Sequence, residues 1–552
     1  MSTSETHVGS TPKFSLGFIF GLAALFAVVT WGTPAAMASA SDPVIVTESG
    51  RLQGTVGTQM VEYLGIPYAA APEGILRWMP PQSFGKWKGI FQATTAGSEC
   101  PQPNSANTAV VGNEDCLFLN IYTPQGKNRV KPNGRAVMIW IHGGGLTQGA
   151  GSEFDPTPLV TGGDVIVVTI NYRLGVLGFL AQTALDGEWH LAGNYGFMDQ
   201  QYALFWVKSN IAAFGGDPTR VTIFGESAGG LSIYSQLASP LAADLYQRAI
   251  AQSGAYAGFA PDYRVNILPI ATAETTGGGP EVVPGNTLAG TVGCSDETAA
   301  CLRAADATTL IFAQGTIFPF IDGTLLTETP GDAFASGNFN HVPVITGNNH
   351  DEYRYFVATD FNFNPKLGPV TIANYPTDVT IVFGSTIAPS VQSEYPVPSG
   401  SLAPVPPLQL AAAGTDGIFV CTARRAERSL SQYATVWAYE FSDENAPVPA
   451  PAYAMLNFPM GAYHSADVQY LSNRNGVPAP FTADQQKLSE AMISYWTKFA
   501  KKGNPNSSET PHWERYNSRI DERQSFVPPT PTVVAGSEFD SFHMCSSYWD
   551  VF

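Results

Sequence analysis

Short apolar stretches recur along the chain, with helical or polar segments between them. Each consists mostly of β-branched, aliphatic or aromatic residues and is too short for a typical helix, so it predicts a buried strand. These stretches are residues 117–122, 136–141, 165–170, 221–224, 249–252, 342–346 and 436–441. Residues 136–141 are apolar throughout, as expected for a strand that is covered on both faces. Nearer the N-terminus, residues 44–46 and 60–64 predict short antiparallel strands around turns at Gly50 and Gly54.

Helical patterns lie between these strands. Residues 200–213 predict an amphipathic helix that stops at a Gly-Gly pair, and residues 231–237 predict a second helix. Strands that alternate with helices predict an α/β fold with a mostly parallel central sheet flanked by helices. Two stretches, 256–292 and 358–410, are rich in Gly, Pro or Thr and are predicted to be large loop or cap insertions. We therefore expect one domain with insertions over residues 41–552.

The first forty residues have the pattern of a secretory signal peptide. Residues 16–31 are apolar, and this run is shorter than the ~20 residues that span a bilayer. Small residues follow at Ala36, Ala38 and Ala40, with the spacing of signal cleavage sites. We therefore predict a signal peptide over residues 1–40, a secreted or periplasmic protein, and no stable membrane anchor after cleavage. A retained N-terminal anchor is the alternative.

Cysteine usage agrees with export. The chain has six cysteines, an even number that suits an oxidising compartment in which disulfide bonds form. The alternative is six buried free thiols in a cytosolic protein. Sequence proximity favours three pairs, which are Cys100 with Cys116, Cys294 with Cys301, and Cys421 with Cys545.

The charge of the chain limits its partners. A net charge of −18 and a pI near 4.8 argue against nucleic acid or an anionic membrane surface as a partner, because both are negatively charged. Apolar residues make up 44% of the chain, which supports a large core.

One short motif carries the first sign of chemistry. Gly225-Glu-Ser-Ala-Gly229 follows the predicted strand 221–224 and precedes the predicted helix 231–237. It fits the G-x-S-x-G pattern of a nucleophile elbow, in which a serine lies on a sharp turn between a strand and a helix. The pentapeptide alone is a weak signal in a glycine-rich chain. Its position between a strand and a helix makes Ser227 a candidate nucleophile.

A serine hydroxyl needs a histidine base that is oriented by a carboxylate. In this arrangement the acid and then the histidine follow the serine along the chain. His464, in a loop after the predicted strand 436–441, fits best as the base. For the acid, Asp351 and Glu352 both follow a predicted strand, and their order along the chain does not separate them. The histidines that follow the serine are His341, His350, His464, His512 and His543.

The oxyanion of a tetrahedral intermediate needs backbone N–H donors at about 3 Å. His142-Gly-Gly-Gly145 follows the apolar strand 136–141, which is the position of an H-G-G-G oxyanion loop. The glycine amides of this loop and the amide of Ala228 are therefore the candidate donors.

Together these motifs resemble the type-B carboxylesterases, the cholinesterase-like branch of the α/β-hydrolases. The chain also contains Glu114-Asp-Cys-Leu-Phe-Leu-Asn-Ile-Tyr122, which is similar to the second signature of that family. The resemblance implies an α/β-hydrolase fold and a serine carboxylic-ester hydrolase that needs no metal or organic cofactor. It extends from about residue 44 to 545, and its other matching stretches are 171–175, 194–200, 214–218, 252–254, 321–323 and 496–500.

The resemblance also implies roles for individual residues. It favours Glu352 over Asp351 as the acid and His464 as the base, although Tyr353 replaces the glycine that usually follows the acid. The disulfide pairing of the family is the one that proximity favours. Residues expected around the triad are the oxyanion donors Gly144, Gly145 and Ala228, the supporting Glu226 and Ser253, and a buried ion pair of Arg173 with Asp199.

The resemblance bears on the substrate too. Cholinesterases carry a tryptophan for the choline cation between their first two cysteines, but residues 101–115 contain no aromatic side chain. We therefore expect short- to medium-chain or aryl esters as small-molecule substrates, rather than acetylcholine. A lipase on long-chain esters and a non-catalytic binding protein on the same scaffold are the alternatives. An imidazole with the ordinary pKa of ~6.5 predicts activity above that pH.

Overall fold

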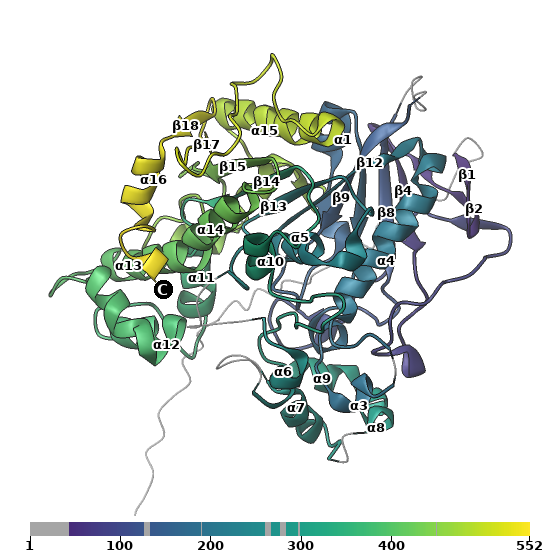
Figure 1. Ribbon diagram of the computed structural model, residues 1–552, viewed down its shortest axis with the longest axis horizontal. Coiled ribbons are helices and arrows are strands. Elements are labelled where there is room, and N and C mark those ends of the chain that lie inside the picture. The colour runs from purple at the N-terminus through teal and green to yellow at the C-terminus, as the bar shows by residue number, and fades with distance from the viewer. Residues whose placement is uncertain are drawn as a thin grey trace, which may run out of the picture. The chain divides into compact units, whose positions relative to one another are not determined.

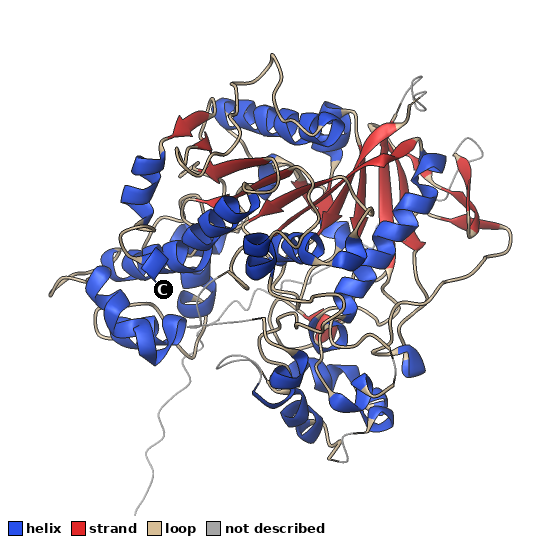
Figure 2. Ribbon diagram, viewed as in Figure 1, coloured by secondary structure: helices blue, strands red, loops and turns tan. Residues whose placement is uncertain are grey.

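The computed structural model describes residues 43–551 apart from 126–132, 189, 260–266, 277–282, 296–297 and 449. The predicted signal peptide lies outside the described residues, as do parts of the predicted loop 256–292. Within the described residues, eleven strands form the main sheet (Figures 1 and 2). From one edge to the other they are β18 (Thr532–Val534), β17 (Arg523–Phe526), β15 (Val436–Phe441), β14 (Val344–Asn349), β13 (Arg248–Gln252), β12 (Gly216–Glu226), β9 (Arg135–Ile141), β11 (Ile166–Ile170), β8 (Phe118–Pro124), β4 (Met60–Pro67) and β3 (Thr55–Val56).

The middle of the sheet, from β11 to β17, is parallel, and both of its edges are antiparallel. The predicted mostly parallel sheet is therefore confirmed, and each stretch predicted as one of its main strands is a strand. The edge strands β17 and β18 were not predicted. β17 is polar in sequence, yet Arg523 is buried because its guanidinium pairs with Glu427 at 2.7 Å. A hydrophobicity pattern does not detect a strand that is buried by ion pairing.

Alternate residues of β9 contribute to two separate cores. Successive side chains of a strand point to opposite faces, so an entirely apolar strand needs a cover on both. Val137, Ile139 and Ile141 pack on the side of α4 (Tyr195–Asn210) and α5 (Ala228–Ala238), whereas Ala136, Met138 and Trp140 pack on the side of α1 (Thr157–Gly163) and α15 (Ala483–Lys502). Figure 1 shows α1 and α15 above the sheet and α4 and α5 below it.

Helix α4 differs from its prediction. It begins five residues before the predicted start at 200, and its first six residues are all buried, so it is not amphipathic over its whole length. Two of these buried residues are polar but paired: Asp199 with Arg173 at 2.7 Å, and Gln200 with Ser232 at 3.0 Å. The expected ion pair of Arg173 with Asp199 is therefore confirmed. These buried polar pairs interrupt the spacing of apolar residues, so hydrophobic periodicity did not predict the first part of the helix.

The part of the prediction that reads residues 358–410 as a loop is wrong. Most of this stretch is α12 (Tyr375–Glu394) and the start of α13 (Val405–Gly414). Both helices have proline in the first turn, where the missing N–H costs no intrahelical hydrogen bond. Gly384 breaks α12 with a φ of 74°, a left-handed value that suits glycine. In this stretch Pro376, Pro406 and Pro407 lie at helix starts, and Pro389 lies inside α12, so a high proline content did not indicate a loop.

The other elements lie around this framework. The predicted loop 256–292 contains two short helices, and the predicted N-terminal strands form antiparallel pairs as expected. Among the described residues, no helix has both the length and the apolar content needed to cross a membrane. The remaining helices and strands are α2 (Gly175–Gly178), α3 (Thr183–Asp186), α6 (Ile270–Thr276), α7 (Gly285–Thr291), α8 (Ala299–Ala304), α9 (Ala307–Ala313), α10 (Pro330–Ser336), α11 (Arg354–Phe356), α14 (Cys421–Leu430), α16 (Gly536–His543), β1 (Val44–Thr47), β2 (Gly50–Gln53), β5 (Ile90–Gln92), β6 (Gln102–Pro103), β7 (Val110–Val111), β10 (Phe154–Asp155) and β16 (Asn473–Arg474).

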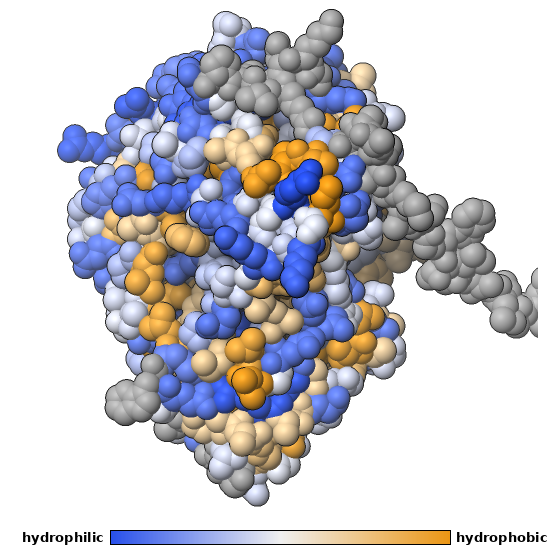
Figure 3. Space-filling view, turned by 90° about the vertical axis from the view of Figure 1, so that its right-hand side faces the viewer, coloured by the Kyte–Doolittle hydropathy of each residue, from blue (hydrophilic) through white to orange (hydrophobic). Residues whose placement is uncertain are grey.

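The surface and the disulfide bonds complete the description. On the face shown in Figure 3, hydrophobic residues form small groups among hydrophilic ones, as is typical of a face in contact with water.

The disulfide between Cys421 and Cys545 joins positions 124 residues apart and holds the C-terminal segment against α14. The other two bonds join Cys100 with Cys116 and Cys294 with Cys301, so all three pairs are those that proximity favours.

Candidate active site

Ser227 lies on a strained turn between β12 and α5. Its φ of 56° and ψ of −121° are unusual for a residue other than glycine, as expected at a nucleophile elbow. The backbone N–H of Ser227 donates to Gln252 O at 2.9 Å, which ties the turn to β13. A side chain at Gly229 would collide with the carbonyl of Ile141, so the helix reaches the sheet only with glycine there.

A histidine and a glutamate from two loops meet near this turn. Nδ1 of His464 lies 2.5 Å from Oε2 of Glu352, and both side chains are buried. The other carboxylate oxygen of Glu352 accepts hydrogen bonds from Ser253 Oγ at 2.6 Å and from the backbone N–H of Asn349 at 2.7 Å. These donors hold the carboxylate in one orientation, so it can fix the imidazole ring.

Glu226 brings a second carboxylate to the other side of the ring. Its Oε1 lies 3.3 Å from Nε2 of His464 and accepts a hydrogen bond from Ser465 Oγ at 2.7 Å. Burial raises the pKa of Glu226 to about 7, although the nearby His464 opposes this shift. Burial disfavours the charged form of His464, but the carboxylates of Glu226 and Glu352 outweigh it and raise the pKa of the imidazole to about 9. The ordinary value of ~6.5 expected from sequence is therefore wrong, because two carboxylates flank the ring.

The described structure shows no hydrogen bond between the serine and the base. Nε2 of His464 is buried and has no hydrogen-bond partner within the described residues, so it makes no hydrogen bond with Ser227 Oγ. Catalytic hydrogen bonds are often long in free enzymes and tighten when substrate binds. Because the pKa of the imidazole is raised to about 9, Nε2 accepts the serine proton only after the ring has lost its own second proton.

The glycine loop lies against the serine. A methyl group placed on Gly143 would be 3.2 Å from Ser227 Cβ, and Gly144 and Gly145 have left-handed φ values of 98° and 63°. In the described part of the chain, the amides of Gly144, Gly145 and Ala228 donate to no protein acceptor. Three unpaired N–H donors beside a serine can bind a developing oxyanion.

His142 sets the conformation of this loop. Its Nδ1 lies 2.9 Å from the carbonyl oxygen of Gly143, and its ring stacks on Tyr172 with centroids 4.4 Å apart. Burial lowers the pKa of His142 to about 4, so the ring is neutral at physiological pH. A neutral ring can donate a hydrogen bond from Nδ1 to Gly143 O, and this bond helps to fix the glycine loop in its position beside Ser227.

The other candidates from the sequence lie elsewhere. Asp351 contacts His350 at 3.2 Å and Arg354 at 2.8 Å, so it points away from His464. His341 Nε2 lies 2.9 Å from Gly337 O, and His512 is exposed beside Glu514. His543 contacts two carboxylates, Asp416 at 2.6 Å and Glu440 at 2.8 Å.

Aromatic rings that the sequence analysis missed surround His464. The centroids of Phe356 and Phe419 are each 5.0 Å from that of the imidazole, and Tyr355 lies at 6.2 Å. Tyr355 and Phe356 follow the acid closely in the chain, so their position was a usable signal. Phe419 precedes α14 in a distant segment, and no local pattern links it to the site. These rings form an apolar wall that suits the hydrophobic part of a small ligand.

Comparisons with known proteins show which proteins the whole chain is similar to. Residues 41–530 match the model of the carboxylesterase family. The chain is 33% identical over 499 residues to the para-nitrobenzyl esterase of Bacillus subtilis (strain 168), covering 87% of this chain and 94% of that protein. It is 32% identical over 507 residues to the acylcarnitine hydrolase of Mus musculus, covering 86% and 85%. A solved structure of a PNB esterase matches with a TM-score of 0.74 and 28% identity, covering 92% of this chain and 100% of that one.

Proposed function

We propose, for a chain that belongs to the carboxylesterase family, that Ser227, His464 and Glu352 hydrolyse carboxylic esters through an acyl-enzyme. The observation that carries this proposal is the buried pair of His464 with Glu352, in which Nε2 of His464 lies 3.3 Å from Glu226, the residue that directly precedes Ser227 on the elbow. The elbow supplies a nucleophile, the pair supplies an oriented base, and the glycine loop supplies donors for the oxyanion.

The first half of the reaction forms the acyl-enzyme. Nε2 of His464 takes the proton of Ser227 Oγ as the oxygen attacks the carbonyl carbon of the ester. The amides of Gly144, Gly145 and Ala228 stabilise the oxyanion. The imidazolium then donates its proton to the leaving alcohol, and Glu352 stabilises the charged ring while it exists.

The second half releases the acid. Water attacks the acyl carbonyl after His464 removes one of its protons, and the same amides stabilise the second oxyanion. The imidazolium returns the proton to Ser227 Oγ, so the free acid leaves and the starting enzyme is restored. Each step uses groups of this chain and one water molecule.

The substrate is proposed to be a short- to medium-chain or aryl ester. The apolar rings of Tyr355, Phe356 and Phe419 around His464 support an acyl or aryl group of moderate size. The name of the similar para-nitrobenzyl esterase contains a substituted benzyl group, so an ester with an aromatic ring in its alcohol part is also consistent with this proposal. The three disulfide bonds support export of the chain, since such bonds persist in oxidising compartments.

The test compares initial rates on p-nitrophenyl acetate, butyrate and palmitate. It uses the exported protein, whose N-terminus is expected at Ser41. We expect turnover of the butyrate ester and a loss of about 10⁴-fold or more in Ser227→Ala. Ser235→Ala is the matched control, since this buried serine lies in α5 and its hydroxyl has no hydrogen-bond partner among the residues that the structure describes. A folded wild type that is inert on all three esters would instead favour a binding protein, and a preference for palmitate would favour a lipase.

A further inference from the structure

A second cluster of titratable side chains lies outside the triad. His350, Glu440 and His543 each offer one ligand atom, and these atoms all lie within 4.8 Å of one another. They come from the loop after β14, from β15 and from the end of α16, so only the fold brings them together. Two imidazoles and one carboxylate form a common ligand set for zinc in proteins.

Each histidine of the cluster has a carboxylate at its Nδ1. His543 Nδ1 lies 2.6 Å from Asp416 Oδ1, and His350 Nδ1 lies 3.2 Å from Asp351 Oδ1. Both rings therefore have Nε2 left for the centre of the cluster, where His543 Nε2 lies 2.8 Å from Glu440 Oε1. Metal-binding histidines almost always give their second nitrogen to a carboxylate, a carbonyl or water, which fixes the tautomer and the ring orientation.

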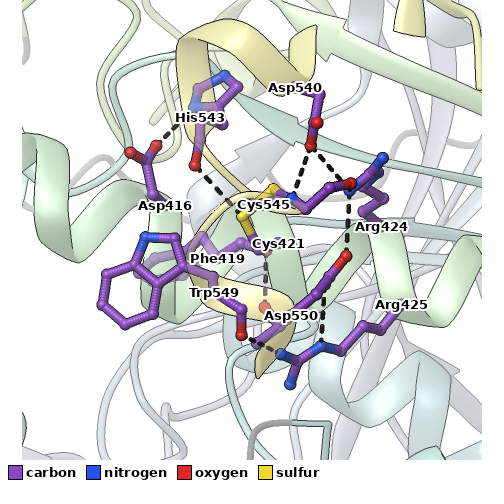
Figure 4. The surroundings of a disulfide bond; sticks show 12 residues. Asp416, Phe419, Cys421, Arg424, Arg425, Asp540, His543, Cys545, Trp549 and Asp550 are labelled. Carbon is purple, nitrogen blue, oxygen red and sulfur yellow. Dashed lines mark hydrogen bonds and ion pairs between the residues drawn. A yellow bond between two sulfur atoms is a disulfide. The ribbon is translucent and has the colours of Figure 1, made fainter. Parts of the chain in front are cut away.

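The surrounding structure holds these ligands in place. Cys545 follows His543 by two residues and is bonded to Cys421, so the end of α16 is fixed to α14 (Figure 4). Figure 4 also shows the carboxylate of Asp416 directed at the His543 ring. The side chains of His543 and Glu440 are 1% and 5% exposed, whereas that of His350 is 17% exposed. A small ion can therefore reach the cluster from the side of His350.

We propose that His350, Glu440 and His543 bind one Zn²⁺ ion, with Asp351 and Asp416 orienting the two imidazoles. The ligand types favour zinc, since imidazole and carboxylate suit this metal and the hard cations Mg²⁺ and Ca²⁺ prefer oxygen alone. On binding, the ion replaces the proton between His543 and Glu440, and that proton is released to bulk water. The ion links α16 to the loop that bears Glu352, so its role is structural, and it supplies no group to the steps of ester hydrolysis.

The test titrates tag-free, EDTA-treated full-length mature protein with ZnCl₂ in a calorimeter. We expect about one zinc per chain and a higher Tm with zinc than with EDTA. His350→Gln and Glu440→Gln should each weaken zinc binding by at least about tenfold, and Asp416→Asn by about 10- to 100-fold. If the buried Glu440→Gln variant fails to fold, His350→Gln still tests the zinc site. The side chain of His350 is partly exposed, so this substitution should disturb folding less.

Two control variants separate this site from others. His512→Gln removes an exposed histidine that lies beside Glu514, and it should leave zinc binding unchanged. His464→Gln removes the proposed base and should abolish esterase activity while zinc binding persists, so the two proposals fail independently. Zinc affinity that is unchanged in His350→Gln, or that is lost in His512→Gln or His464→Gln, overturns the proposal. Failure of the wild type to bind zinc overturns it as well.

Discussion

At the scale of single residues, the position of Glu226 governs the proposed base. Its carboxylate lies beside Nε2 of His464, on the opposite side of the ring from Glu352. Each carboxylate favours the charged imidazolium, which helps the steps in which that charge forms. The negative charge of Glu226 also keeps His464 protonated in the free enzyme. Glu226 therefore stabilises the imidazolium during the reaction, but it raises the pH that is needed for His464 to act as a base.

The first prediction concerns the pH dependence of this pair. His464 must be neutral to accept a proton, so activity should rise as pH increases through its raised pKa, near 9. Glu226→Gln removes one of the two carboxylates and should move this rise to lower pH by about one unit or more. The measurement is kcat/KM for p-nitrophenyl butyrate between about pH 5.5 and 10, corrected for spontaneous hydrolysis.

The exposed variant Glu514→Gln serves as the control and should leave the pH profile in place. A profile of Glu226→Gln that coincides with that of the wild type would show that Glu226 does not act on the base. A fall in rate at every pH without a shift would point to a structural role only.

At the scale of elements, the elbow depends on how closely α5 approaches β9. Gly229 lies in the first turn of α5, and the space beside it is filled by the carbonyl oxygen of Ile141 at the end of β9. Backbone atoms there have no room to move away, because β9 is hydrogen-bonded to strands on both sides. The glycine thus serves packing as well as the turn.

We therefore expect Gly229→Ala to destabilise the protein by about 1–3 kcal/mol or more, through overpacking. It should also lower kcat, since the displaced helix carries the amide of Ala228. Gly290→Ala is the matched control: this glycine lies in α7, and no atom of the described residues lies within 4 Å of its Cβ position, so alanine should stabilise the protein by about 0.4–1 kcal/mol. Urea unfolding of both variants measures the change in the free energy of unfolding, which should be a decrease for Gly229→Ala and an increase for Gly290→Ala. Equal changes in the two variants would contradict the packing argument.

At the scale of the whole molecule, the C-terminal segment is attached by chemistry from distant parts of the chain. Cys545 is bonded to Cys421, and Arg424 pairs with Asp540 at 2.9 Å and with Asp550 at 3.2 Å (Figure 4). This attachment places α16 beside β15 and the loop after β14. This disulfide closes a much longer loop than the one between Cys294 and Cys301, so it should reduce the conformational entropy of the unfolded chain more.

Removing this disulfide should cost more than removing a short one. The loop-entropy relation gives about 5 kcal/mol for a separation near 124 and about 2.5 kcal/mol for one near 7. Cys421→Ser/Cys545→Ser should therefore lower the free energy of unfolding by more than Cys294→Ser/Cys301→Ser does. Urea denaturation of the two double variants tests this order, and a larger loss from the short loop would contradict it.

The sequence by itself determined the features that depend on neighbouring residues. The strand, the G-x-S-x-G turn and the helix around Ser227 are consecutive, so their pattern was sufficient to predict the elbow. The apolar run of β9 predicted burial on both faces, and family motifs spread along the chain predicted the fold that the structure confirms. Local propensity and side-chain periodicity act over a few residues, which is the range that a single sequence records directly.

Only the tertiary structure decided which distant side chains share a charge environment. Glu352 was favoured over Asp351 by the family resemblance alone, and the structure adds their partners: Glu352 contacts His464, and Asp351 contacts Arg354. The structure also placed Glu226 beside His464, which raises the pKa of the imidazole. It also made helices of the proline-rich stretch and brought His543 to Glu440. Burial and electrostatic interaction depend on distance in space between segments a hundred or more residues apart, and spacing along the chain does not specify that distance.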